Sequence, residues 1–480
     1  MKNHMRHSSI HKAAAALAIL FLLGLAPLAD AQVERAAITL TNTGGKIVFI
    51  PAVRISEVPA TNDFNNPDSE FCFQRSKSTD NFVLFWAKEY GDDPMSNSVT
   101  NRRFDVDAIL KESDRFFNYY MDVLKWVDKD TSYASKYKFL FFVFGGSSGT
   151  AFGGDIGGKV GAFWSPATRI NHGPYGVVAH ELGHSFQAMI RDDYAAKHPG
   201  ERAPGFVGGS FHEMTSQWML WQVYPEWMTF ENYHLNDWMK ATHLAFLHQD
   251  NQYHSAQVLE YWSEKHGVEF IGKMWREVQP GEDPVMTYKR LTGLSQDQFN
   301  DEIFDAYRHF VTWDMPRIEK VAARYANQHT TSINAVTNGW FQIATNKCPQ
   351  NYGYNAIQLK VPADGTKVSL DFKGVVGEEG FSNVHPERAG WRYGFLASKE
   401  DGSRVYSDIF SKSPGTAEFA VPAHTKFLWL VVSGAPTEHW IHAGGRGGRG
   451  GNDNAGANTT EQWPYQFKLT GTSPEDSIIH

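Results

Sequence analysis

The sequence predicts an α+β protein in which a mixed sheet and a helical subdomain are followed by an all-β sandwich or jelly roll. Three changes of pattern lead to this fold class. Apolar runs typical of buried strands flank one amphipathic helix before residue 165. Helical periodicity dominates residues 174–325, and short alternating strands separated by turn dipeptides follow residue 330.

The first part of the chain alternates strand and helix signals. Residues 138–144 are nearly all large and apolar, which is typical of a strand buried on both faces. In residues 106–127, apolar side chains recur at helical spacing, and a glycine-rich stretch occupies residues 145–158. The elements expected here are strands at 46–50, 81–87, 138–144 and 160–164 and a helix at 106–127.

The last third of the chain shows strand signals only. The clearest expected strands are residues 356–361, 368–372, 427–432 and 465–469. Four of the five tryptophans in this part suit either a packed core, which is the favoured interpretation, or a glycan-binding surface. These are Trp391, Trp429, Trp440 and Trp463. The Gly-Arg tract at 444–451 lies between two of these strands, so we expect a surface loop rather than an RNA-binding segment.

The start of the chain has the three regions of a secretory signal peptide. Basic residues precede an apolar run at 13–26, and the small-residue pattern Ala29-Asp30-Ala31 follows. We therefore expect cleavage after Ala31 and a secreted protein, extracellular or periplasmic; a buried N-terminal helix is the alternative. No later stretch approaches the length of apolar residues that a membrane span needs, so no such span is expected.

The overall composition excludes several classes of protein. The 480 residues include 45 basic and 53 acidic side chains, and a net charge of −8 argues against nucleic-acid binding through bulk charge. Two cysteines exclude a disulfide-stapled mini-fold and a Cys-rich zinc module. In an oxidising compartment Cys72 and Cys348 either pair or remain free thiols, and the sequence leaves both outcomes open.

One segment carries the signature of a metal site. Residues 180–184 read His180-Glu181-Leu182-Gly183-His184, and two histidines four residues apart lie on one face of a helix. Both imidazoles can reach one Zn²⁺ ion there. Glu181 directly follows the first histidine, which places its carboxylate where it can act as general base toward a water that the metal activates. A helix with two solvated histidines is the structural alternative.

Two histidines need a third protein ligand, and Glu213 is the best candidate. It lies at the start of a second expected helix, where it could instead close a capping box with Ser210. His212 is a rival ligand, and Asp192 and Asp193 follow the first helix too closely to turn back easily.

Three neighbouring residues suit supporting roles. Gln217, one turn beyond Glu213, could orient a metal-binding histidine. Gln187 could do the same or hydrogen-bond a neighbouring helix. Gly183 costs helix stability, which suggests that another backbone approaches closely there.

The order of these elements and motifs resembles that of zincin metallopeptidases. Glu213-Met-Thr-Ser216 is similar to the second motif of the gluzincin branch, in which a Glu from a following helix completes a His/His/Glu zinc site. That branch often has an Asp four residues after the Glu, where this sequence has Gln217. More narrowly, residues 160–187, 352–357 and 463–466 resemble the secreted AvrXca/Svx-type zincin-like proteins of plant-associated bacteria.

The changes of pattern along the chain divide it into four parts, and the resemblance implies a catalytic cleft in the third. The expected organisation is a signal peptide at 1–31, a lead-in segment at 32–67, a zincin-like metallopeptidase domain at 68–330 and a C-terminal β-sandwich domain at 331–475. Phe163-Trp164 is the candidate edge strand with which an extended peptide would pair, and residues 145–158 are a candidate rim. Candidate donors to an oxyanion are Tyr233, His234, Tyr253 and His254, among which spacing does not choose.

These observations predict a secreted zinc metalloendopeptidase. His180, His184 and Glu213 are expected to hold Zn²⁺, and Glu181 to activate water. The expected partner is an extracellular protein or peptide, with or without glycans, and neither nucleic acid nor a membrane span is expected. Two alternatives stay open: a non-catalytic extracellular binding protein for proteins or glycans, and a zinc enzyme acting on peptidoglycan cross-links.

Overall fold

The computed structural model describes residues 36–41, 45–146, 149–441 and 461–480. The expected signal peptide and the Gly-Arg tract lie outside these ranges. Among the helices that are described, none combines the length and the apolar character needed to cross a bilayer.

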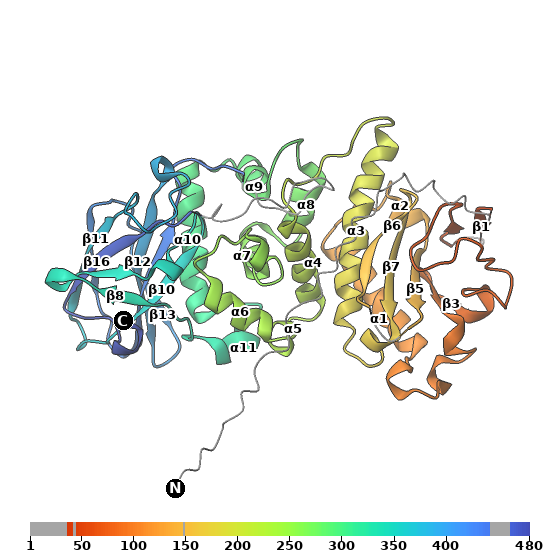
Figure 1. The fold of residues 1–480 in the computed structure, drawn as a ribbon, viewed down its shortest axis with the longest axis horizontal. Helices are drawn as coiled ribbons and strands as arrows, with labels where there is room; N and C mark the ends of the chain where they lie inside the picture. Colours follow the sequence, from red (N-terminus) through yellow and green to blue (C-terminus); the bar gives the residue numbers. More distant parts are fainter. Residues whose placement is uncertain (1–35, 42–44, 147–148, 442–460) are drawn as a thin grey trace, which may run out of the picture.

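A five-stranded mixed sheet lies at one end of the molecule (Figure 1). Its central strands β4, β5 and β7 are parallel, and every residue in them is buried. Antiparallel strands β3 and β6 form the two edges. The bounds, in sheet order, are β3 Ser76–Ser78, β4 Phe82–Trp86, β5 Phe139–Phe144, β7 Val160–Pro166 and β6 Phe152–Ile156; β1 Ile38–Leu40 and β2 Val48–Ile50 form a separate pair.

Two long helices pack on this sheet. Helix α1, Val106–Asn118, continues into a π-helical turn at Tyr119–Val123 and so stops short of the expected end at residue 127. Helix α3, Gly176–Lys197, contacts strands β6 and β7 on one side and helix α4, Ser210–Val223, on the other. Figure 1 shows α3 standing between the sheet and the helical region.

The helical region fills the middle of the molecule, between the sheet and the C-terminal strands (Figure 1). Helix α10 begins with a complete capping box formed by Ser295 and Gln298. The remaining helices are α2 Tyr133–Lys136, α5 Trp227–Phe230, α6 Tyr233–Ala241, α7 Ala256–His266, α8 Phe270–Glu277, α9 Pro284–Thr292, α10 Gln296–Thr312 and α11 Glu319–Ala322.

The C-terminal part consists of two antiparallel sheets that share a core. Rings from the two sheets meet across it, as in the stacked pair Phe372 and Tyr393, whose centroids are 4.2 Å apart. One sheet has the order β10-β15-β12-β13 and the other β14-β11-β16-β9-β8. Their bounds are β8 Ile333–Ala335, β9 Phe341–Ile343, β10 Tyr354–Leu359, β11 Lys367–Gly374, β12 Trp391–Lys399, β13 Arg404–Tyr406, β14 Gly415–Ala420, β15 Thr425–Gly434 and β16 Tyr465–Thr470.

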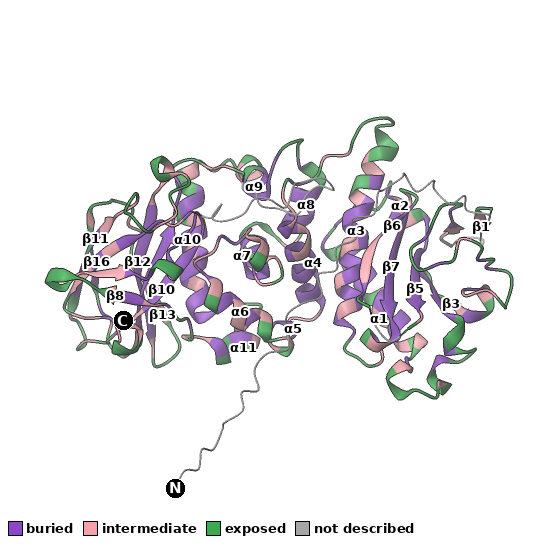
Figure 2. Ribbon diagram, viewed as in Figure 1, coloured by how far each residue is buried: buried purple, intermediate pink, exposed green. Residues whose placement is uncertain are grey.

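A second core runs from the N-terminal sheet through the helices to the C-terminal strands. It includes Tyr354, Leu396 and Trp429, which lie on β10, β12 and β15 and pack toward the helical region. Figure 2 shows buried residues, in purple, in the N-terminal sheet, in the helices and in the C-terminal strands. The chain is therefore mixed α+β, as expected, and the helical region is packed against strands at both of its ends.

The structure decides two questions that the sequence left open. Trp391, Trp429 and Trp463 are buried and Trp440 packs against the C-terminal core, so the core interpretation of these tryptophans is right. Cys72 and Cys348 are both buried and unpaired, so a disulfide between them is excluded. Burial raises the pKa of the Cys348 thiol, which keeps it protonated.

Candidate metal centre

Helix α3 carries the His-Glu-x-x-His motif. It begins at Gly176, two residues after the start expected at Pro174. Its apolar residues Val178, Leu182 and Phe186 are buried in the core, which leaves the face that carries the two histidines directed toward α4. Because the helix is held on both sides, the positions of its side chains are fixed by packing.

Gly183 brings α3 and α4 into close contact. A Cβ atom added at this position would lie 2.5 Å from Ser216 Oγ and 3.3 Å from Ser216 Cα. The Ser216 hydroxyl donates a hydrogen bond to the His180 carbonyl oxygen. The approach of another backbone that Gly183 suggested is therefore present, and it places the second turn of α4 beside the motif.

The capping-box interpretation of Ser210 and Glu213 is wrong. Helix α4 begins at Ser210 after the N-cap residue Gly209, and no side chain caps it. The Ser210 hydroxyl instead donates to the Leu247 carbonyl oxygen, 2.7 Å away. The Glu213 carboxylate is consequently free to face α3.

Three side-chain atoms from α3 and α4 converge on one point. Glu213 Oε2 lies 3.2 Å from His180 Nε2 and 3.1 Å from His184 Nε2, and the two imidazole nitrogens are 3.2 Å apart. Ligands about 2.0–2.1 Å from a tetrahedral ion are about 3.3 Å from each other, so this triangle fits zinc. Among the residues that the structure describes, His180, His184 and Glu213 are the group of His, Cys, Asp or Glu side chains whose ligand atoms lie close enough together to hold one metal ion.

The ring nitrogens that face away from this point are already paired. His180 Nδ1 lies 3.2 Å from Gln217 Oε1, and His184 Nδ1 lies 3.1 Å from Gln187 Oε1. The Gln187 amide nitrogen donates to the His212 carbonyl oxygen, which fixes the orientation of this amide. An amide oxygen only accepts, so Nδ1 carries the proton and Nε2 offers its lone pair. This is the tautomer that binds a metal through Nε2.

Burial raises the pKa of both Glu181 and Glu213, and the neighbouring histidines lower it, but the net shift differs between the two residues. Burial would raise the pKa of Glu213, but the adjacent imidazoles of His180 and His184 outweigh burial and hold this pKa well below its usual range. Glu181 is 8% exposed, and burial raises its pKa against the nearby histidines. Glu213 is therefore a firmly ionised ligand candidate, whereas Glu181 is suited to accept a proton.

The rival ligands lie elsewhere. The His212 ring packs against Trp275, with ring centroids 4.9 Å apart, and burial lowers its pKa to about 4. Asp192 pairs with Arg191, and Asp193 accepts a hydrogen bond from the Tyr133 main-chain nitrogen. None of these three side chains belongs to the converging group.

One of the four candidate oxyanion donors contacts the centre. The Tyr253 ring lies 6.2 Å from the His180 ring, and its hydroxyl interacts with the Glu213 carboxylate. Burial and the charge of Glu213 raise the pKa of Tyr253, so the phenol keeps its proton. His234 lies behind it, 6.1 Å from the Tyr253 ring, and His234 in turn meets His254. The exposed Tyr233 packs on His234 rather than on His180, His184 or Glu213.

The prediction that Phe163 and Trp164 form the edge strand is wrong, because the edge is the neighbouring strand. Phe163 and Trp164 lie in β7, which is paired on both sides, and the edge is β6, inside the stretch expected to be a glycine-rich rim. A Cβ atom at Gly153 would lie 2.0 Å from the Glu181 carbonyl oxygen, so this edge strand rests directly on α3. Gly153 was not among the expected site residues, although two adjacent glycines between Phe152 and Ile156 signal such a close approach.

The comparisons with known proteins give a family and slight structural likenesses. No curated protein matches the sequence. A functionally unknown conserved protein from Bacillus anthracis is 12% identical over 54% of this chain and 50% of its own length, with a TM-score of 0.31. The chain therefore spans about half of that protein's length.

Two peptidase structures from Clostridium perfringens are similarly distant. The ZmpB metallopeptidase is 13% identical over 82% of this chain and 77% of its own, with a TM-score of 0.26. The catalytic module of the metalloprotease ZmpA is 11% identical over 75% and 67%, with a TM-score of 0.27. By its residues 41–476, the chain belongs to the family described as a family of unknown function, DUF6055.

Proposed function

We propose that this protein is a secreted zinc metallopeptidase with a zincin-like catalytic domain and a C-terminal β-sandwich. One observation carries the proposal: His180 Nε2, His184 Nε2 and Glu213 Oε2 lie 3.1–3.2 Å from one another. Two neutral imidazoles and one carboxylate form the His₂Glu ligand set of catalytic zinc sites, which leaves a position open for water or substrate. The export of the protein is part of the proposal and follows from the expected signal peptide.

The residues around the three ligands supply the other functions that hydrolysis requires. A bound zinc ion supplies Lewis acidity and lowers the pKa of water. Glu181, whose pKa burial raises, takes the proton from the attacking water and passes it to the leaving amine. Tyr253, which stays protonated beside Glu213, donates a hydrogen bond to the oxyanion that develops on the substrate carbonyl.

The exposed edge of β6 is the binding site proposed for the substrate backbone. An extended peptide can add to a free strand edge through main-chain hydrogen bonds. Strand β6 lies directly against α3 at Gly153, so a peptide on this edge would pass the metal-binding face of the helix. Because Trp391, Trp429 and Trp463 are fully or nearly buried, a polypeptide is favoured as substrate over a glycan.

The test is hydrolysis of a peptide library by the zinc-loaded protein and by two variants. Glu181→Gln removes the general base, so cleavage should fall by at least 100-fold. The matched control is Glu264→Gln, which changes an exposed glutamate of α7 and should leave cleavage unchanged. Equal cleavage by the wild-type and Glu181→Gln proteins would contradict the proposed role.

The competing function is a binding protein in which the metal is structural. It requires that the Glu181→Gln protein and the wild type bind the same partner equally and that neither cleaves a peptide. Peptidoglycan fragments added to the same assay test the third function, a zinc enzyme that acts on peptidoglycan cross-links. Such an enzyme would release smaller fragments from them and leave linear peptides intact.

A further inference from the structure

Two hollows meet along the outer part of α3. The larger, of about 840 Å³, is lined by His184, by Gly153 and Gly154 of β6 and by the chain at 202–208. It therefore runs from the candidate metal centre along the edge strand. The smaller, of about 200 Å³, lies farther along the same helix.

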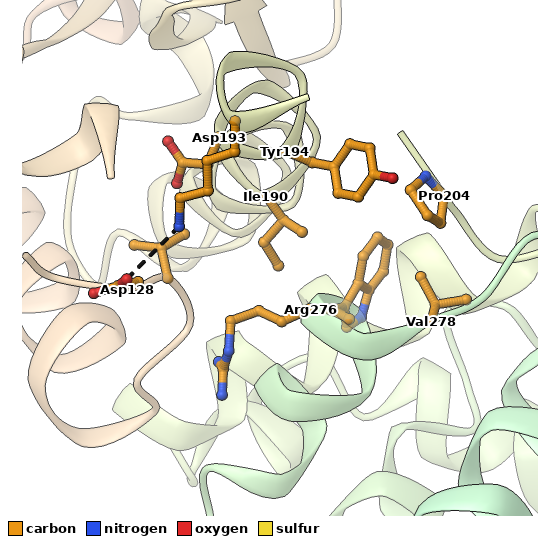
Figure 3. Close-up of a pocket in the computed structure, with 10 residues that line it drawn as sticks. Asp128, Ile190, Asp193, Tyr194, Pro204, Arg276 and Val278 are labelled. Carbon is orange, nitrogen blue, oxygen red and sulfur yellow. Dashed lines mark ion pairs between the residues drawn. The ribbon is translucent and has the colours of Figure 1, made fainter. Parts of the chain in front are cut away.

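The two hollows are adjacent and share part of their lining. Ile190, Pro204 and Trp275 line both of them. In the smaller hollow, Figure 3 shows Ile190 and Tyr194 of α3 beside Pro204 and Val278. A polypeptide lying in the larger hollow can thus place a side chain in the smaller one without leaving the surface of α3.

The walls of the smaller hollow select an apolar group. Ile190, Tyr194 and Pro204 are half-buried, so apolar surface remains uncovered inside it. A cavity on the order of 150 Å³ lined by apolar side chains holds a benzene ring, so the size is sufficient for an aromatic side chain.

The charged groups at its side already have partners. Lys197 Nζ lies 3.7 Å from the Asp128 carboxylate, the pair drawn in Figure 3. Arg276 donates to the carbonyl oxygens of Lys125 and Trp126. Asp193, which also lines the hollow, accepts a hydrogen bond from the Tyr133 main-chain nitrogen. Because these charged groups have partners within the chain, an apolar ring can enter the hollow without leaving a charge unpaired.

We infer that this smaller hollow, the Ile190 pocket, binds a large apolar side chain of the substrate at a fixed distance from the scissile bond. The inference rests on the proposed peptidase function and adds a substrate class to it. Along α3, Ile190 and Tyr194 are about 9 and 15 Å beyond His184, at 1.5 Å per residue. An extended peptide advances about 3.3 Å per residue, so the selected side chain lies about three to five residues from the cleaved bond.

The binding test uses the Glu181→Gln protein, so that no peptide is consumed. Its probes are fluorescein-labelled peptides of twelve residues, built from Ala and Ser, with a single Phe moved one position at a time. Burying one Phe should tighten binding about 10- to 100-fold over the peptide without Phe. Adding Ile190→Gln or Tyr194→Gln should abolish this gain, whereas the control Leu291→Gln, a half-buried leucine of α9, should preserve it.

Cleavage of the same peptides by the wild-type protein measures how many residues separate the Phe from the cleaved bond. Preferred cleavage three to five residues from Phe supports the inference. Cleavage without a preferred spacing, or a Phe effect that both pocket variants retain, would overturn it while the peptidase function stands. Phe-dependent binding that both pocket variants abolish, together with no cleavage of any peptide, would instead overturn the peptidase function and leave the pocket as a binding site.

Discussion

The Gln187 side chain joins the His184 imidazole to the main chain of His212. Its Oε1 lies 3.1 Å from His184 Nδ1, and its amide nitrogen donates to the His212 carbonyl oxygen at 2.9 Å. His212 directly precedes Glu213, so one amide sets both the tautomer of a histidine on α3 and the position of a carboxylate on α4.

Replacing Gln187 should weaken metal binding without unfolding the protein. Gln187→Leu removes the acceptor for His184 Nδ1–H, and loss of such a partner typically costs about 10–100-fold in metal affinity. Competition with a chromophoric zinc chelator measures the change. Gln358→Leu, which alters a half-buried glutamine of β10, is the control and should bind zinc as the wild type does. Wild-type affinity in a folded Gln187→Leu protein would show that this hydrogen bond does not orient the ligand.

Adjacent glycines of β6 should respond very differently to a methyl group. A Cβ atom at Gly153 would lie 2.0 Å from the Glu181 carbonyl oxygen, whereas one at Gly154 meets no atom within 4 Å. Gly153→Ala should therefore destabilise the protein by about 1–3 kcal/mol through the forced separation of β6 and α3. Urea unfolding measures this difference, and Gly154→Ala is the matched control. Similar unfolding midpoints for the two variants would mean that the edge strand does not rest on α3.

Acid should destabilise the protein through a buried histidine that is not part of the candidate metal centre. His329 is buried, its Nε2 meets the Tyr354 hydroxyl at 2.7 Å, and burial lowers its pKa to about 3. Between about pH 6.5 and pH 3 the unfolded chain binds a proton that the folded chain does not. The free energy of unfolding should therefore fall with decreasing pH by up to about 1.4 kcal/mol per pH unit from this residue.

A single substitution isolates the contribution of His329. His329→Gln should flatten the dependence of unfolding free energy on pH over this window, as followed by urea unfolding from pH 7 to pH 4. His172→Gln, at an exposed position, should leave the slope as it is in the wild type. Identical slopes for the wild-type and His329→Gln proteins would exclude the buried neutral histidine as a cause of acid sensitivity.

Much of the fold could be read from local sequence. The runs at 138–144 and 427–432 are so rich in apolar residues that only buried strands accommodate them, and both lie in strands, at Phe139–Phe144 and Thr425–Gly434. The metal motif could also be recognised from the sequence, because helical spacing alone places His180 and His184 on one face.

The remaining features depend on contacts between distant residues. Strands β6 and β7 form a hairpin, and local sequence does not say which of the two pairs with β5 and which remains the edge. The Ser210 hydroxyl bonds Leu247 rather than the start of its own helix, a contact across 37 residues that no capping pattern reveals. Likewise, Tyr253 could be separated from three similar candidates only by its position beside Glu213.

Metal analysis of the purified protein tests the central claim most directly. After zinc loading and gel filtration, elemental mass spectrometry should find about one zinc per wild-type chain and per Glu181→Gln chain, and far less in His180→Ala and Glu213→Gln proteins that remain folded. Only a trace of transition metal in the wild type, or full zinc retention after either ligand substitution, would contradict the assignment of His180, His184 and Glu213 as a zinc site.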